Sequence, residues 1–212
     1  MVFCFSIFFM IDIKITLPLS KSNIKELDTT VSLSDMTWED YETLAKNNNL
    51  NYRISYYERV ITLMSPSRNH ERIAQTIGIL INAYCRMFKL KYFALGSADI
   101  RNPPYSAKQP DAQYCFETEK NVPDLAVEVI YSSGGIADLD KYKNLNVEEV
   151  WLWQNNELKI FCSVDSTWNQ NCQSKHLDKL TESLLNKHIC QGLNKNHLSI
   201  ETEFVEELSN LF

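Results

Sequence analysis

Two acidic residues in apolar, strand-like segments are the side chains of this sequence most suited to chemistry. Glu128 lies in the apolar run 125–130, and Asp111 follows Pro110 and opens a second apolar segment at 112–116. An ionised carboxylate inside a strand covered on both faces is costly unless it is paired or bound to a cation. If the two segments lie side by side in a sheet, Asp111 and Glu128 form the nucleus of a metal site.

Hydrolysis of a phosphodiester is the reaction that such a pair could support. It needs an activated water, neutralised charge around phosphorus and a stabilised leaving oxygen, and Mg²⁺ held by carboxylates can supply all three. A structural reading fits the same spacing: Asp111 would cap a loop, and Glu128 would pair with a cation in the core. Spacing alone does not choose between the two readings.

Asp124 repeats the Pro-Asp pattern four residues before Glu128. In a regular strand, at ~3.3 Å per residue, the two positions are about 13 Å apart. That distance is too long for sharing one ion, so Asp124 is interpreted as the residue that begins the strand.

His70 and Glu71 fall in the first turns of a long predicted helix. A carboxylate at that end is favoured by the helix dipole, which is a sufficient structural reason for Glu71. The alternative is that Glu71 is a further metal or water ligand, and the sequence leaves both readings open. His70 could contact a phosphate, but a structural role is the simpler interpretation.

Lys141 is the candidate cation near the attacking water or the scissile phosphate. It belongs to a predicted helix at about 137–145, which follows the Glu128 strand after the turn 132–135 and can fold back over that strand's end. The alternative is a solvated surface lysine.

The surrounding elements predict one α/β domain with a mixed central β-sheet flanked by helices, hairpins lying early and late in the chain. A short helix should begin near Thr37, with Trp38, Tyr41 and Leu44 on its inner face, and a long helix should run from Ser67 through Phe88. The expected strands are 52–56, 59–64, 92–96, 111–116, 124–131, 149–153 and 157–162, with a loop at 97–108 and undefined strand or helices near 176–187 and 200–211. We divide the chain into a flexible lead-in (1–34), the domain (35–165) and a C-terminal extension packing on or beside it (166–212).

Composition limits the function and the setting. A net charge of −6 argues against a strong non-specific nucleic-acid binder, although one cleft can still hold a basic patch. Six cysteines without a CxxC pair indicate a reducing, cytoplasmic setting, and four histidines show no zinc spacing. The uncharged run 1–11 is too short to span a bilayer and lacks signal-peptide features, so residues 1 to about 10 are expected outside the domain and no membrane association is predicted.

Four motifs occur in a characteristic order. They are Met-Ser-Pro-Ser-Arg-Asn-His-Glu at 64–71, Pro-Asp at 110–111, Pro-Asp-Leu-Ala-Val-Glu-Val-Ile-Tyr-Ser-Ser-Gly-Gly at 123–135, and Val-Glu-Glu-Val-Trp-Leu-Trp at 147–153. Together they resemble the Uma-two family of restriction endonucleases, within the PD-(D/E)XK nuclease superfamily, over roughly residues 36–162.

The resemblance implies a restriction-endonuclease-like core and Mg²⁺-dependent cleavage of DNA. Asp111 matches the Asp of the Pro-Asp motif, Glu128 the acidic residue of the second half of the motif, and Glu71 the acidic residue of the first core helix; Asp111 and Glu128 would bind Mg²⁺. Restriction enzymes of this fold often act as dimers, so a homodimer is one expected assembly.

The lysine of the superfamily pattern is displaced. The pattern asks for Lys two residues after the Glu, where this chain has Ile130. In the Uma-two family the lysine typically lies on the next helix, four residues before a Tyr. If that Tyr is Tyr142, the position of the lysine is occupied by Asp138 in this chain. Lys141 is three residues further on, shares a helix face with Asp138 and could reach the same cleft.

The sequence therefore predicts a Mg²⁺-dependent DNA endonuclease that uses Asp111, Glu128, Glu71 and Lys141. The displaced lysine and the acidic net charge motivate an alternative, a catalytically weak nuclease-fold protein that binds DNA or a protein partner. An unrelated α/β protein with a structural Glu128 is a third reading.

Overall fold

The structure is a computed structural model, and it describes residues 27–48, 52–131, 136–165, 167–171 and 173–211. The prediction that residues 1 to about 10 stand apart from the domain lies outside the described residues. No helix in the described part of the chain is both long and apolar enough to cross a membrane.

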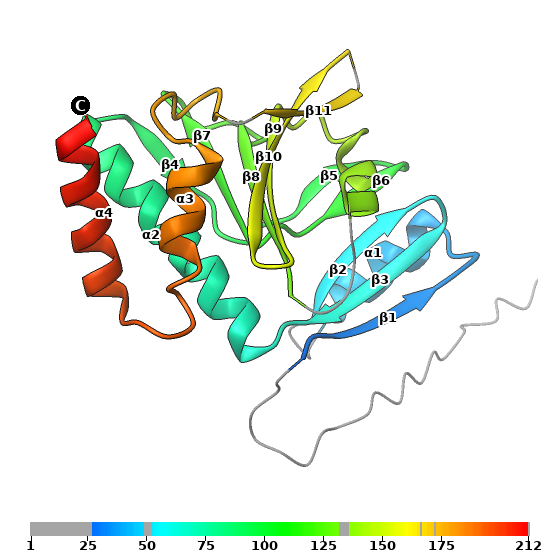
Figure 1. Cartoon of the computed structure of the whole chain (residues 1–212). Coiled ribbons are helices and arrows are strands. Elements are labelled where there is room, and N and C mark those ends of the chain that lie inside the picture. Colours follow the sequence, from blue (N-terminus) through cyan, green and yellow to red (C-terminus); the bar gives the residue numbers. More distant parts are fainter. Residues whose placement is uncertain (1–26, 49–51, 132–135, 166, 172, 212) are drawn as a thin grey trace, which may run out of the picture.

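Two β-sheets form the molecule (Figure 1). The larger sheet has the order β11-β10-β9-β8-β7-β4, and all its neighbours are antiparallel except β8 and β9, which are parallel. Its strands are β4 (Tyr92–Ala94), β7 (Ala112–Phe116), β8 (Leu125–Ile130), β9 (Glu149–Gln154), β10 (Glu157–Val164) and β11 (Thr167–Asn171). It is the mixed sheet that the sequence predicts.

The smaller sheet is antiparallel and has the order β1-β3-β2-β6-β5. Its strands are β1 (Thr29–Leu33), β2 (Arg53–Tyr57), β3 (Val60–Ser65), β5 (Ile100–Asn102) and β6 (Ser106–Lys108). The expected early hairpin is confirmed as β2 and β3, but it belongs to this second sheet, so the expectation of a single sheet is wrong. The hairpin can do so because helix α1 (Trp38–Lys46) covers one of its faces with Trp38 and Tyr41.

Three helices pack on the larger sheet and share one hydrophobic core with it (Figure 1). Helix α2 (Arg68–Phe88) begins after Ser67, whose hydroxyl accepts a hydrogen bond from the His70 amide at 3.2 Å. Helices α3 (Glu182–Ile189) and α4 (His197–Leu211) pack beside α2, so the C-terminal extension forms part of the core.

Both faces of β8 are covered, which explains why Glu128 is buried. Leu125, Val127 and Val129 point into the core under the helices. Ala126 and Ile130 point to the other face, where they meet the 3₁₀ helix η1 (Ile136–Tyr142). Because successive side chains of a strand alternate, Glu128 lies on the η1 face.

Several boundaries differ from the sequence-based expectation. Residues 97–108 are not only a loop, since they contain β5 and β6, and residues 29–33 of the expected lead-in form β1. These strands are short and polar and gain order from pairing with distant partners, which local pattern does not reveal. The helix expected at 137–145 is the 3₁₀ helix η1, and the capping pair of Thr37 and Asp40 at α1 is confirmed.

Candidate functional site

Asp111 lies directly before β7, beside the part of β8 that carries Glu128. The antiparallel pairing of β7 and β8 ends with Ala112 opposite Val127, so Asp111 stands one residue beyond the ladder. The Asp111 amide donates to the Val127 carbonyl at 2.9 Å, and the Val129 amide donates to Asp111 Oδ2 at 2.6 Å. The backbone and side chain of Asp111 therefore bond to the residues on either side of Glu128, so the two predicted residues come from neighbouring segments of the sheet.

The Asp111 carboxylate is held by two basic side chains. Its Oδ1 atom pairs with the Arg53 guanidinium and lies 2.9 Å from His70 Nε2. Only 1% of the Asp111 side chain is exposed, so these two partners offset the cost of burying the carboxylate.

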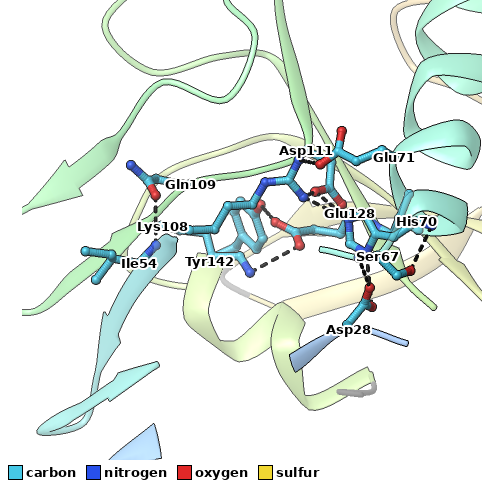
Figure 2. A network of polar contacts seen from close by, with 12 residues as sticks. Asp28, Ile54, Ser67, His70, Glu71, Lys108, Gln109, Asp111, Glu128 and Tyr142 are labelled. Carbon is cyan, nitrogen blue, oxygen red and sulfur yellow. Dashed lines mark hydrogen bonds and ion pairs between the residues drawn. The ribbon is translucent and has the colours of Figure 1, made fainter. Parts of the chain in front are cut away.

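His70 lies behind Asp111 and is fully buried. Its Nδ1 atom is 3.1 Å from Asp28 Oδ2, and the Ser67 amide donates to Asp28 Oδ1 at 2.8 Å (Figure 2). Burial raises the pKa of Asp28, but the hydrogen bonds and charge of His70 and the hydrogen bonds of Ser67 outweigh it and hold that pKa below its ordinary value. The ring thus connects two carboxylates inside the protein, which is the structural role that the sequence favours for it.

Glu128 is also held at both oxygens (Figure 2). The Tyr142 hydroxyl donates to Oε1, and Lys108 Nζ lies 3.1 Å from Oε2. Burial, and then the negative charge of Glu128, raises the pKa of Tyr142 well above its ordinary value. Tyr142 therefore remains a hydrogen-bond donor to Glu128.

Glu71 lies in the first turn of α2 and is joined to the pair through Arg53. Arg53 Nη2 donates to Glu71 Oε1 at 2.9 Å, while Nη1 binds Asp111. The Glu71 side chain is 44% exposed, in contrast to the buried Asp111. The structure therefore brings Glu71 to the predicted site, with Arg53 between it and Asp111.

Lys141 faces the same region from η1, but its ion pair is with another residue. Its Nζ atom is 2.7 Å from Asp138 Oδ1, the residue three positions earlier. Both side chains line the pocket to which Glu128 also contributes. The structure therefore places Lys141 at the site without making it the partner of Glu128.

This pocket lies between the two sheets and has a volume of about 280 Å³. The smaller sheet contributes hydroxyl-bearing residues to its wall, namely Thr30, Ser32, Ser55 and Thr62. The charged residues that line it are Asp28, Arg53, Lys108, Glu128, Asp138 and Lys141. Arg53 lines this pocket, whereas its ion-pair partner Asp111 is not among the lining residues.

Sequence reasoning missed Arg53 and Lys108, the two cations that bind the carboxylates. Both come from the smaller sheet, Arg53 from β2 and Lys108 from β6. The signals available were an Arg in an otherwise aromatic and apolar strand and a Lys three residues before Asp111, and neither is specific.

Asp111 and Glu128 have the oxygen-ligand chemistry that Mg²⁺ prefers. Mg²⁺ prefers oxygen ligands and often takes only one or two carboxylates, with water and substrate oxygens completing its shell. In the described part of the chain no three His, Cys, Asp or Glu side chains are grouped to hold an ion, so a protein-only cage is not formed. Asp111 and Glu128 supply two carboxylates from neighbouring segments of the sheet. Each of them is bound by a cation, Asp111 by Arg53 and Glu128 by Lys108, so both positions stabilise positive charge.

Comparison with known proteins gives a similar fold and a family. The chain is similar in fold to the crystal structure of a "putative nuclease belonging to DUF820" from Anabaena variabilis ATCC 29413, with a TM-score of 0.51 and 12% identity, over 73% of this chain and 99% of that one. A search of curated proteins gives no match. The model of the Uma2 family, described as "Putative restriction endonuclease", matches residues 38–190, well over half of the chain. The chain therefore belongs to the Uma2 family.

Proposed function

We propose that this protein is a Mg²⁺-dependent endonuclease of the PD-(D/E)XK superfamily that hydrolyses phosphodiester bonds of DNA. One observation carries the proposal: Asp111 bonds to both chain neighbours of Glu128 on β8, beside a pocket to which Glu128 contributes. The family assignment favours DNA as the substrate.

Asp111 and Glu128 would hold the metal ion, and Glu71 would assist them as a further carboxylate. When bound, Mg²⁺ would supply a Lewis acid and lower the pKa of a bound water. Tyr142 keeps Glu128 oriented by donating to one of its oxygens, and His70 Nε2 contacts Asp111 Oδ1 from the buried side. These contacts fix the two carboxylates before any ligand arrives, which is what a precise site requires.

The cations of the pocket would bind the DNA backbone. Arg53 and Lys141 line the pocket and can donate to phosphate oxygens, so cations are available at the pocket although the whole chain carries −6 and carboxylates line the pocket in equal number. In the reaction a water oxygen bonds to phosphorus and one P–O ester bond breaks. The leaving oxygen takes a proton, which leaves one phosphate monoester and one hydroxyl end.

A plasmid cleavage assay tests the proposal. Purified protein should nick or linearise supercoiled DNA with Mg²⁺ and should fail to do so with a chelator. Asp111→Asn and Glu128→Gln keep the size of the side chain but remove its charge and one acceptor oxygen, so each should lower the cleavage rate by about 100-fold or more. Cleavage that survives both substitutions sinks the assignment of these residues.

A matched control excludes general loss of folding. Glu157→Gln changes an exposed carboxylate at the start of β10, away from the pocket, and should cut at the wild-type rate. Thermal unfolding of all three variants shows whether the two site variants remain folded at the assay temperature.

Asp138 favours a second candidate function, binding without efficient cleavage. It occupies the position where the family pattern has a lysine, and it pairs with Lys141. In that case the protein would bind DNA, or a protein partner, and would not cut with Mg²⁺. Cleavage that appears only in Asp138→Lys would favour this second function.

The proposal includes a reducing, cytoplasmic setting. The described cysteines are free thiols, and three of them are buried as small apolar side chains.

A further inference from the structure

The two positions where a lysine is expected cannot supply one. Ile130 is buried in the apolar cluster on the η1 face of β8. Asp138 brings a negative charge to η1, and Lys141 on the same turn pairs with it at 2.7 Å. The positive charge of Lys141 is therefore paired with Asp138 and not with Glu128.

Lys108 provides the positive charge beside Glu128 that residues 130 and 138 do not provide. Its Nζ atom is 3.1 Å from Glu128 Oε2, with 11% of the lysine side chain and 6% of the glutamate side chain exposed. Both residues line the pocket between the sheets. A charge pair that is largely removed from water is stronger and better oriented than the same pair on a surface.

The smaller sheet explains how Lys108 reaches this place. On β6, Ala107 is fully buried in the core between α1 and the smaller sheet, so Ser106 and Lys108 point the other way. The Ser106 hydroxyl donates to the Lys141 carbonyl at 2.8 Å. This hydrogen bond joins β6 to η1, the element on which the family pattern places its lysine. Lys108 therefore approaches Glu128 from β6 instead of from η1.

We propose that Lys108 is the lysine of this nuclease site, in place of the residues at 130 and 138. Its ammonium group provides the positive charge beside Glu128 that orients the attacking water and stabilises negative charge at the phosphate, while Lys141 only binds the DNA backbone. This inference rests on the proposed endonuclease function.

Lys108→Met and Lys141→Met distinguish the two lysines by kinetics. Lys108→Met should lower kcat by about 100-fold with KM for DNA within about threefold of wild type, because it removes a charge that acts in the transition state. Lys141→Met should raise KM by about five- to tenfold and leave kcat within about threefold, because a backbone contact is made equally in the bound complex. Lys143→Met, an exposed lysine of the same segment paired with Asp140, is the matched control and should match wild type.

A binding measurement provides a readout that does not depend on turnover. Mn²⁺ titrated calorimetrically into the protein without DNA should bind about tenfold more tightly to Lys108→Met, because the variant lacks a positive charge next to a metal-binding carboxylate. A lysine that merely supports the fold would lower the unfolding temperature without tightening Mn²⁺ binding.

The outcomes separate this inference from the proposed function. If wild type cuts DNA and Lys108→Met keeps its kcat, or if Lys141→Met loses kcat instead, Lys108 is not the lysine and the nuclease assignment stands. If wild type neither binds Mn²⁺ nor cuts, the proposed function fails and this inference fails with it. Should Lys108→Met not fold, Lys108→Gln replaces it, since its amide can still donate to Glu128; the same loss of kcat is expected, and a wild-type kcat overturns the proposal.

Discussion

Arg53 and Asp111 form an ion pair that joins the smaller sheet to the larger one. Arg53 extends from β2, and Asp111 precedes β7 on the other sheet. The Arg53 side chain is 15% exposed and that of Asp111 only 1%. The guanidinium also binds Glu71 on α2, so one side chain connects both sheets and the first core helix.

Arg53→Gln should destabilise the protein by about 3 kcal/mol, because it leaves a buried carboxylate without its main cation. Asp111 would keep its bonds to His70 and the Val129 amide, which limits the loss. Urea unfolding followed by tryptophan fluorescence measures the change. Arg59→Gln, at an exposed Arg in the turn between β2 and β3, should alter stability by less than about 0.5 kcal/mol. A loss below 1 kcal/mol for Arg53→Gln would contradict the importance of the pair.

Asp28 should make stability depend on acidic pH. Its pKa in the folded protein lies below the ordinary value of 3.8, because its hydrogen bonds outweigh the effect of burial. A lowered pKa means that its stabilisation is complete above the unfolded pKa and is lost as the pH falls through the folded one. The difference in unfolding free energy between wild type and Asp28→Asn should be constant from pH 7 to 5 and shrink below about pH 4. A difference that stays constant down to pH 2.5 would refute this.

Tyr142→Phe removes the hydrogen bond to Glu128 and keeps the ring in the core on the η1 face. A hydrogen bond to a buried charged group is worth about 1.5–3 kcal/mol, so a loss of that size is expected in urea unfolding at pH 7. Tyr105→Phe, at a 63% exposed tyrosine, should leave stability unchanged. Equal effects of the two substitutions would mean that the Glu128 contact contributes little.

Gly192→Ala should weaken the packing of the C-terminal extension on α2. A Cβ atom at Gly192 would collide with the hydroxyl of Thr76, a fully buried residue of α2, and would lie 3.0 Å from the Ile189 carbonyl oxygen. Overpacking of this kind costs about 1–3 kcal/mol. The midpoint of thermal unfolding should fall accordingly, whereas Asn194→Ala at an exposed position nearby should not change it. An unchanged midpoint in Gly192→Ala would show that this contact yields easily.

Asp111 and Glu128 stand out in the sequence because carboxylates are unusual in or beside apolar strand segments. Glu128 interrupts an apolar strand, and Asp111 opens the neighbouring one, so their chemistry and the sheet that positions them are encoded in short segments. The long helix α2 and the cap of α1 were predicted for the same reason, since helical periodicity and capping residues are local.

The cations could not be found in this way, because distant pairing brings them to the site. Lys108 reaches Glu128 only after β6 pairs with β2, some fifty residues earlier in the chain. Arg53 reaches Asp111 only because the early hairpin forms a sheet of its own. Three-residue strands such as β5 and β6 show no period that would separate them from a loop.

The smaller sheet has an apolar core of its own, formed with α1 by Trp38, Tyr41, Ile54, Tyr56, Ile61, Leu63 and Ala107. Its links to the rest of the molecule include the charged contacts of Arg53 and Lys108, and Ile100 reaches the other core from β5. Such a unit can open while the remainder stays folded. Backbone amides of β2 and β3 should then exchange with deuterium faster than those of β8 and β9.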